Sequence, residues 1–168
     1  VALGRSVLGR RITAVVRGDP ASERKFLVVG CIHGDECAGA AVVRRLEAAL
    51  ALPPLQLWLV RDLNPDGHVA RTRTNAHGVD LNRNFPAAWR AGPTGPEWGG
   101  PRPLSEPESR IARALVRRLD PDVTIWLHQP QAVVRAWGRS VGTARRYARL
   151  AGASFRAATA TSPPTPIT

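Results

Sequence analysis

The sequence KFLVVGCIHGDE, residues 25–36, passes from an almost uninterrupted apolar run into a short polar turn. An apolar run of this kind is typical of a strand that is covered on both faces of a sheet. Residues 36–51 then repeat apolar side chains at helical spacing and stop at Pro53 and Pro54. We therefore predict a buried strand over residues 25–31, a turn, and a helix over residues 36–51.

The rest of the chain alternates between strands and helices in the same way. Residues 64–67, Asn-Pro-Asp-Gly, predict a turn, and the Pro-, Gly- and Trp-rich residues 86–103 predict a loop. Further elements are expected as strands over 11–17, 55–61 and 123–127 and as helices over 106–119 and 143–150. This alternation predicts an α/β layered domain with a largely parallel or mixed sheet.

The composition fits one ordinary domain. The chain has 168 residues, of which 43% are hydrophobic and 22% charged, so it can bury a core and does not have the profile of a disordered chain. No apolar run reaches the roughly 20 residues of a membrane span, and the first residues lack the apolar region of a signal peptide. We expect no membrane partner, and a protein that is cytoplasmic or has lost a leader.

The net charge of +11 comes almost entirely from arginine, since Lys25 is the only lysine among 24 cations. An anion-binding surface is one interpretation, but the arginines are scattered along the chain, which favours ordinary solvated cations. The tryptophans do not interleave regularly with arginine, so no nucleic-acid partner is expected. The acids are distributed less evenly, because none follows Asp122.

Cys31 and Cys37 are too few for a disulfide scaffold and lack the spacing of a structural zinc site. We expect them to be small buried residues.

Three segments carry the residue types of a catalytic site. His33 and Glu36 place an imidazole and a carboxylate in the turn after a buried strand, where they can converge on one cation. Residues 73–86 hold several polar side chains and arginines whose planar guanidinium groups suit carboxylate recognition. His128 stands at the end of another buried strand, where a ligand at the sheet's edge is expected.

The order of these motifs resembles the zinc metallocarboxypeptidases of the carboxypeptidase A family, peptidase M14, and among them the short bacterial branch that includes murein peptide amidases. The resemblance is carried by His-x-x-Glu, Asn-Pro-Asp-Gly, Arg-x-Asn-x-x-Gly-x-Asp-Leu-Asn-Arg-Asn-Phe-Pro and a strand ending in His, and it runs from about residue 4 to about residue 155. It implies a three-layer α/β/α fold with a mixed, mostly parallel central sheet. It also implies one zinc ion held by His33, Glu36 and His128, with a fourth position left to water.

The same resemblance implies roles for four residues of the polar segment. Asp80 would fix the tautomer of His33, and Arg73 would stabilise the oxyanion of the scissile carbonyl, with Arg71 as the alternative if the register differs by two. Asn82 and Arg83 would bind the substrate's free α-carboxylate. The implied activity is hydrolysis of a C-terminal peptide bond, or of a bond in a cell-wall peptide, by a zinc-activated water.

One element of the family pattern has no counterpart. The family's general base is a glutamate well downstream of the second histidine ligand, and no Asp or Glu follows Asp122. We expect a catalytic domain over residues 1–156 that lacks the family's last strands and helix, followed by an Ala/Thr/Pro-rich tail over residues 157–168. Two alternatives stay open: an aspartoacylase-like deacylase of N-acyl amino acids, and a non-catalytic domain that binds zinc and carboxylates.

Overall fold

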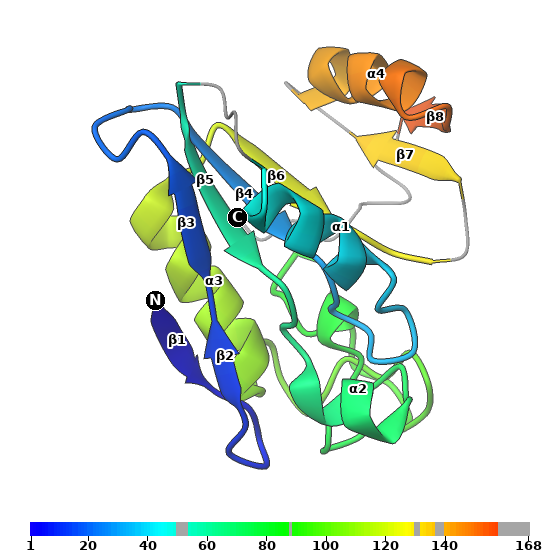
Figure 1. Cartoon of the computed structure of the whole chain (residues 1–168). Coiled ribbons are helices and arrows are strands. Elements are labelled where there is room, and N and C mark those ends of the chain that lie inside the picture. The colour runs from blue at the N-terminus through cyan, green and yellow to red at the C-terminus, as the bar shows by residue number, and fades with distance from the viewer. Residues whose placement is uncertain (50–53, 88, 130–131, 137–139, 158–168) are drawn as a thin grey trace.

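The computed structural model describes residues 1–49, 54–87, 89–129, 132–136 and 140–157. Its centre is a four-stranded sheet (Figure 1). In spatial order the strands are β3 (Val15–Gly18), β5 (Gln56–Val60), β4 (Lys25–Val29) and β6 (Val123–Trp126). β4 pairs in parallel with both β5 and β6, and β3 pairs antiparallel with β5. The predicted mixed, mostly parallel sheet is therefore confirmed.

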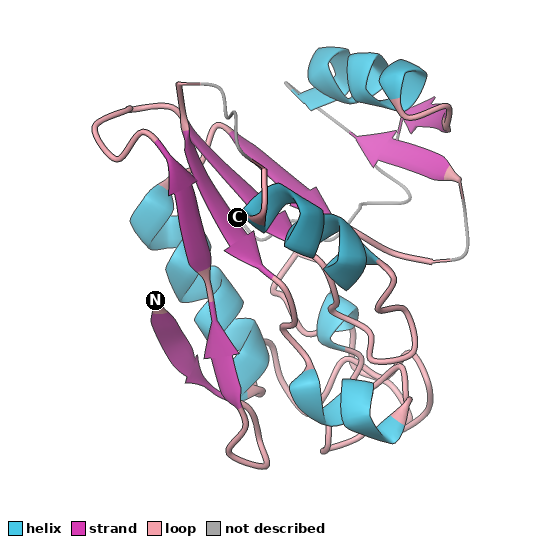
Figure 2. Ribbon diagram, in the orientation of Figure 1, coloured by secondary structure: helices cyan, strands magenta, loops and turns pink. Residues whose placement is uncertain are grey.

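Helices cover both faces of this sheet, which makes three layers (Figure 2). Successive residues of a strand point to opposite faces. Leu27 and Val29 of β4 pack in a cluster with α3 (Pro107–Leu119), whereas Val28 packs in a second cluster with Val43 of α1 (Gly39–Glu47). An apolar strand with both faces covered is what residues 25–31 predicted, and the α/β/α architecture is confirmed.

The strand expected over residues 11–17 is two strands. β2 (Arg11–Thr13) pairs antiparallel with β1 (Ala2–Arg5), and after Ala14 the chain enters the central sheet as β3. The hairpin is attached to the rest of the domain through Asp66, whose carboxylate accepts hydrogen bonds from the Ser6 hydroxyl (2.9 Å), the Arg10 guanidinium (2.7 Å) and the backbone N–H of Leu8 (2.9 Å).

The Asn-Pro-Asp-Gly segment begins a helix, where the sequence predicted only a turn. In α2 (Pro65–Ala70) the Asn64 side chain is the N-cap and accepts from the backbone N–H of Gly67, while proline occupies the first turn. Both features are typical of a helix start. The next short element, the 3₁₀ turn η1 (Leu81–Arg83), is likewise capped by the Asp80 side chain, which accepts from the N–H of Asn82.

After β6 the chain forms a smaller unit. β7 (Val133–Ala136) and β8 (Ser154–Ala157) pair in parallel, and α4 (Val141–Leu150) connects them and packs on both. Ala157, expected to begin the tail, ends β8, and residues 158–168 of that tail lie outside the described residues. Within the described ranges, no helix is long and apolar enough to span a membrane.

Candidate metal centre

The turn after β4 brings His33 and Glu36 to the carboxyl edge of the sheet. Gly34 allows this turn to pack directly on α2, because a Cβ atom at Gly34 would overlap the backbone of Gly67. His33 is buried, with 1% of its side chain exposed, and Glu36 is 15% exposed. Nδ1 of His33 lies 3.1 Å from Oε2 of Glu36, so the two side chains converge as the sequence predicted.

His128 reaches the same edge from β6. Because β4 and β6 are parallel neighbours, their carboxyl ends lie together. The backbone N–H of Leu127 still bonds to the carbonyl of Val29 at 3.0 Å, which keeps the strands in register up to the residue before His128. Nδ1 of His128 then lies 3.0 Å from Oε2 of Glu36. His33, Glu36 and His128 thus offer three ligand atoms within 4.8 Å of one another, although Glu36 and His128 are 92 residues apart in the chain.

The hydrogen bonds around His33 test whether this cluster suits a cation. Nε2 of His33 lies 3.0 Å from Oδ1 of the fully buried Asp80. Since a carboxylate only accepts, Nε2 carries the proton, and Nδ1 of the neutral ring keeps its lone pair. Nδ1 is buried without a hydrogen-bond partner and faces the carboxylate of Glu36. The Nδ1 lone pair and the Glu36 carboxylate therefore face each other with no proton between them. A metal ion can bind to both, and Zn²⁺ prefers this set of imidazole and carboxylate ligands.

Arg73 stands beside the candidate ligands. Its Nη1 donates to Oε1 of Glu36 at 2.9 Å and its Nε to Oδ2 of Asp80 at 3.0 Å. Arg71, two residues earlier, is exposed, has a left-handed backbone (φ 55°) and lines a separate pocket with His68. Of the two arginines weighed from the sequence, the structure therefore brings Arg73 to the cluster and not Arg71.

Asn82 and Arg83 follow Asp80 in η1. The N–H of Asn82 donates to Oδ1 of Asp80 at 2.9 Å, which fixes the start of this turn next to the cluster. Nη2 of Arg83 lies 3.9 Å from the carboxylate of Glu97, a residue whose side chain is 72% exposed. Such a long ion pair at the surface contributes little and leaves the guanidinium group able to exchange partners.

The electrostatics keep the candidate carboxylates charged. Burial raises the pKa of Glu36, but the neighbouring His33 ring and hydrogen bonds from the N–H of Gln129 and from His128 outweigh it, so this pKa lies below its usual value. Burial opposes ionisation of Asp80 in the same way, and the nearby His33 and Arg73 again lower its pKa. Desolvation and the neighbouring His33 lower the pKa of His128, which favours the neutral imidazole that a metal needs.

The zinc carboxypeptidase family model, peptidase M14, matches residues 1–162 of the chain. The chain belongs to this family. Murein peptide amidase A of Escherichia coli K12 is 34% identical over 145 residues, which cover 78% of this chain and 59% of that protein. The chain thus spans about three fifths of the length of this curated relative.

Solved structures agree with the family assignment. The murein-tripeptide amidase MpaA of E. coli O157 matches with a TM-score of 0.71 and 29% identity, covering 100% of this chain and 74% of that one. Bovine thrombin-activatable fibrinolysis inhibitor has a TM-score of 0.77 at 16% identity, covering 98% of this chain and 70% of that one, and shows the shared fold alone.

Zinc is the metal that the family name specifies, and the cluster of His33, Glu36 and His128 has the corresponding donors.

Two features of the site were missed from the sequence. The first is Gln129, whose backbone N–H donates to Oε2 of Glu36 at 3.1 Å and whose side chain accepts from the N–H of Ala38 at 2.7 Å. In the sequence, only its position directly after His128 could have indicated that Gln129 belongs to the site. The second is a disulfide between Cys31 and Cys37. Cys31 is buried as expected, but Cys37 is partly exposed, and the pairing encloses the turn that carries His33 and Glu36.

Proposed function

We propose that His33, Glu36 and His128 hold a single zinc ion, and that the chain acts on a peptide with a free C-terminal carboxylate. The observation that carries this proposal is the buried Nδ1 of His33, which has no hydrogen-bond partner and faces Glu36. A bound zinc ion acidifies its water and polarises a carbonyl group. The three side chains leave room for a fourth ligand if the ion is four-coordinate, as catalytic zinc sites require.

Asp80 is proposed to orient the first ligand. It accepts the Nε2 proton of His33, which fixes the ring's tautomer and makes Nδ1 a better donor to a cation. The same carboxylate accepts from Arg73 and from the backbone of Asn82, so one buried group aligns the metal ligand, the arginine and the following turn.

Arg73 is proposed to stabilise negative charge on the substrate. Its guanidinium group is held beside the cluster by Glu36 and Asp80 and is 26% exposed, so it is fixed but accessible. A positioned guanidinium at this place can donate to a carbonyl oxygen as that oxygen gains negative charge.

Asn82 and Arg83 are proposed to bind the substrate's terminal carboxylate. They lie on the turn directly after Asp80, and the loosely paired Arg83 can form two parallel hydrogen bonds with a carboxylate. Binding of this kind selects substrates that end at the site, which would make the enzyme an exopeptidase or amidase. The murein peptide amidases among the similar proteins favour a cell-wall peptide as the substrate class.

A second candidate function is the non-catalytic domain that the sequence left open. A domain that binds zinc and a terminal carboxylate without turnover would have the same ligand cluster.

Hydrolysis assays separate the possibilities. We expect the zinc-loaded chain to cleave a C-terminal dipeptide or a murein-type tripeptide and not an N-acetyl amino acid, with turnover lost in Arg73→Ala and retained in the control Arg71→Ala. Cleavage of the N-acetyl amino acid alone would establish the deacylase alternative instead. Binding of zinc and peptide without cleavage would overturn the proposed hydrolysis in favour of the non-catalytic function.

A further inference from the structure

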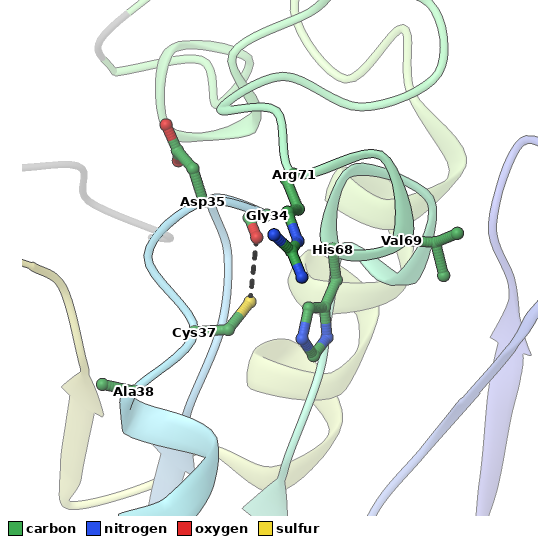
Figure 3. A pocket seen from close by; sticks show the side chains of 7 residues that line it. All are labelled: Gly34, Asp35, Cys37, Ala38, His68, Val69 and Arg71. Atoms are coloured by element: carbon green, nitrogen blue, oxygen red, sulfur yellow. Dashed lines mark hydrogen bonds between the residues drawn. The ribbon is translucent and has the colours of Figure 1, made fainter.

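A second group of metal-ligating side chains includes the two cysteines that flank the same turn. Cys31, Cys37 and His68 each offer one ligand atom, and these atoms lie within 4.8 Å of one another. None of the three belongs to the cluster of His33, Glu36 and His128. Cys37 and His68 also line an open pocket (Figure 3).

His68 has a carboxylate bonded to one of its ring nitrogens, as histidine metal ligands commonly do. Its Nδ1 lies 2.6 Å from Oδ2 of Asp62, and Asp62 is itself fixed by the backbone N–H of Asn64, which donates to Oδ1 at 3.0 Å. A carboxylate that accepts from one ring nitrogen fixes the imidazole and leaves Nε2 with its lone pair. The same arrangement, a carboxylate behind a histidine, supports His33 in the first cluster.

The backbone holds this group together. Gly34 packs against Gly67, at a separation that no Cβ atom would permit, and His68 is the next residue of α2. Asn64 caps the helix and so stabilises the first turn of α2, to which His68 belongs. The two cysteines therefore meet His68 because of close backbone packing and not because of a flexible surface segment.

The surroundings suit reduced cysteines as well as the disulfide that the structure contains. The Sγ atoms of Cys31 and Cys37 lie 3.2 and 3.5 Å from the carbonyl oxygen of His33, and Sγ of Cys37 lies 3.4 Å from that of Gly34. These oxygens can accept from S–H groups once the disulfide is reduced. Arg71 lines the same pocket as Cys37 and His68.

We propose that reduction of the Cys31–Cys37 disulfide creates a second metal site, in which two thiolates and the imidazole of His68 bind a soft cation such as Zn²⁺. A dithiol supplies the two electrons: the S–S bond breaks, the dithiol is oxidised to its own disulfide, and two thiols form. Metal binding then releases the two thiol protons to water. Thiolate and imidazole donors are the set that selects zinc and similar ions.

Cobalt(II) reports this site specifically, because only thiolate ligands give a strong thiolate-to-metal charge-transfer band in the near ultraviolet. Full-length protein is titrated with Co²⁺ before and after treatment with a dithiol that is then removed. We expect the band only in the reduced protein, saturating at one thiolate-bound ion per chain. No band after reduction, or an equal band in the oxidised protein, would overturn the proposal.

Variants test the individual ligands. Cys37→Ser should abolish the band, and Asp62→Asn should weaken Co²⁺ binding about 10–100-fold by removing the negative charge that orients His68 and makes it a better ligand. His77→Ala is the control, since His77 is also exposed and bonded to a carboxylate, that of Glu106, but lies outside the group. If Cys37→Ser fails to fold by circular dichroism, Asp62→Asn decides: unchanged affinity there contradicts the site.

Discussion

The central domain and the β7–α4–β8 unit are built very differently. Two apolar clusters fill the faces of the central sheet, with residues as large as Phe85, Leu59 and Ile12 fully buried. Among the described residues after Gln129, the buried hydrophobic side chains are the alanines Ala136 and Ala148. All 13 acidic residues also precede the smaller unit.

This difference shows where the candidate metal centre gets its rigidity. Its ligands come from the ends of β4 and β6, two strands of the densely packed sheet, and its supporting residues come from the segment between them. None of the candidate site residues lies in the smaller unit. Changes in the central domain should therefore affect folding and metal binding strongly, and changes in the smaller unit should not.

The largest expected effect is on the core of the central domain. Leu59 of β5 is fully buried in the cluster that α1 covers, so Leu59→Ala leaves a cavity. We expect a loss of about 2–5 kcal/mol in the free energy of unfolding, measured by urea titration with the metal removed. A loss below about 1 kcal/mol would show that this face is not the packed core described above.

Asp80→Asn should weaken metal binding without unfolding the domain. The amide oxygen can still accept from Nε2 of His33, but the variant loses the negative charge that strengthens this bond and pairs with Arg73. We expect zinc affinity to fall about 10–100-fold in a competition titration with a chelator. An unchanged affinity in a folded variant would contradict the role assigned to Asp80.

Asp66 gives the central domain a dependence on pH. Burial raises its pKa, but bonds from the N–H of Leu8, from Arg10 and from Ser6 outweigh this and place it below the usual 3.8. A carboxylate with a lowered pKa stabilises the fold above its unfolded pKa, and this contribution is lost as the pH falls through the folded pKa.

Asp66→Asn should therefore lower the free energy of unfolding at pH 7 by about 1–3 kcal/mol. It should also flatten the loss of stability below pH 3.8, both measured by urea unfolding across a pH series. An equally steep acid transition in the variant would assign the effect to other groups.

The smallest effect is expected in the smaller unit. Leu150 ends α4 with 76% of its surface exposed, so Leu150→Ala removes little buried area. We expect a change within about 0.5 kcal/mol by the same urea titration, in contrast to Leu59→Ala. A loss approaching that of Leu59→Ala would remove the distinction between the two regions.

The sequence predicted the layers well, and it placed His33 and His128 at the sheet's edge, because both features depend on local patterns. The apolar run of β4 and the motifs around His33, Asp80 and His128 are readable one segment at a time. It missed what depends on distant contacts. The break at Ala14 follows from pairing with two different sheets, and the Cys31–Cys37 disulfide follows from the shape of the turn.

The helix start at Asn64 was misinterpreted for another reason. Asn-Pro-Asp-Gly is a strong turn signal, and a helical N-terminus uses the same residue types to satisfy its first N–H groups. The helix that follows packs against the turn at Gly34 through Gly67, a distant contact that the four-residue motif does not reveal.

The most direct test of the proposed metal centre is the zinc content of the purified chain, measured by elemental analysis with the Cys31–Cys37 disulfide intact. We predict one zinc ion per chain, retained in His77→Ala and lost in His33→Ala and in His128→Ala. Absence of zinc from the parent protein after exposure to the metal, or its retention in both ligand variants, would contradict the site.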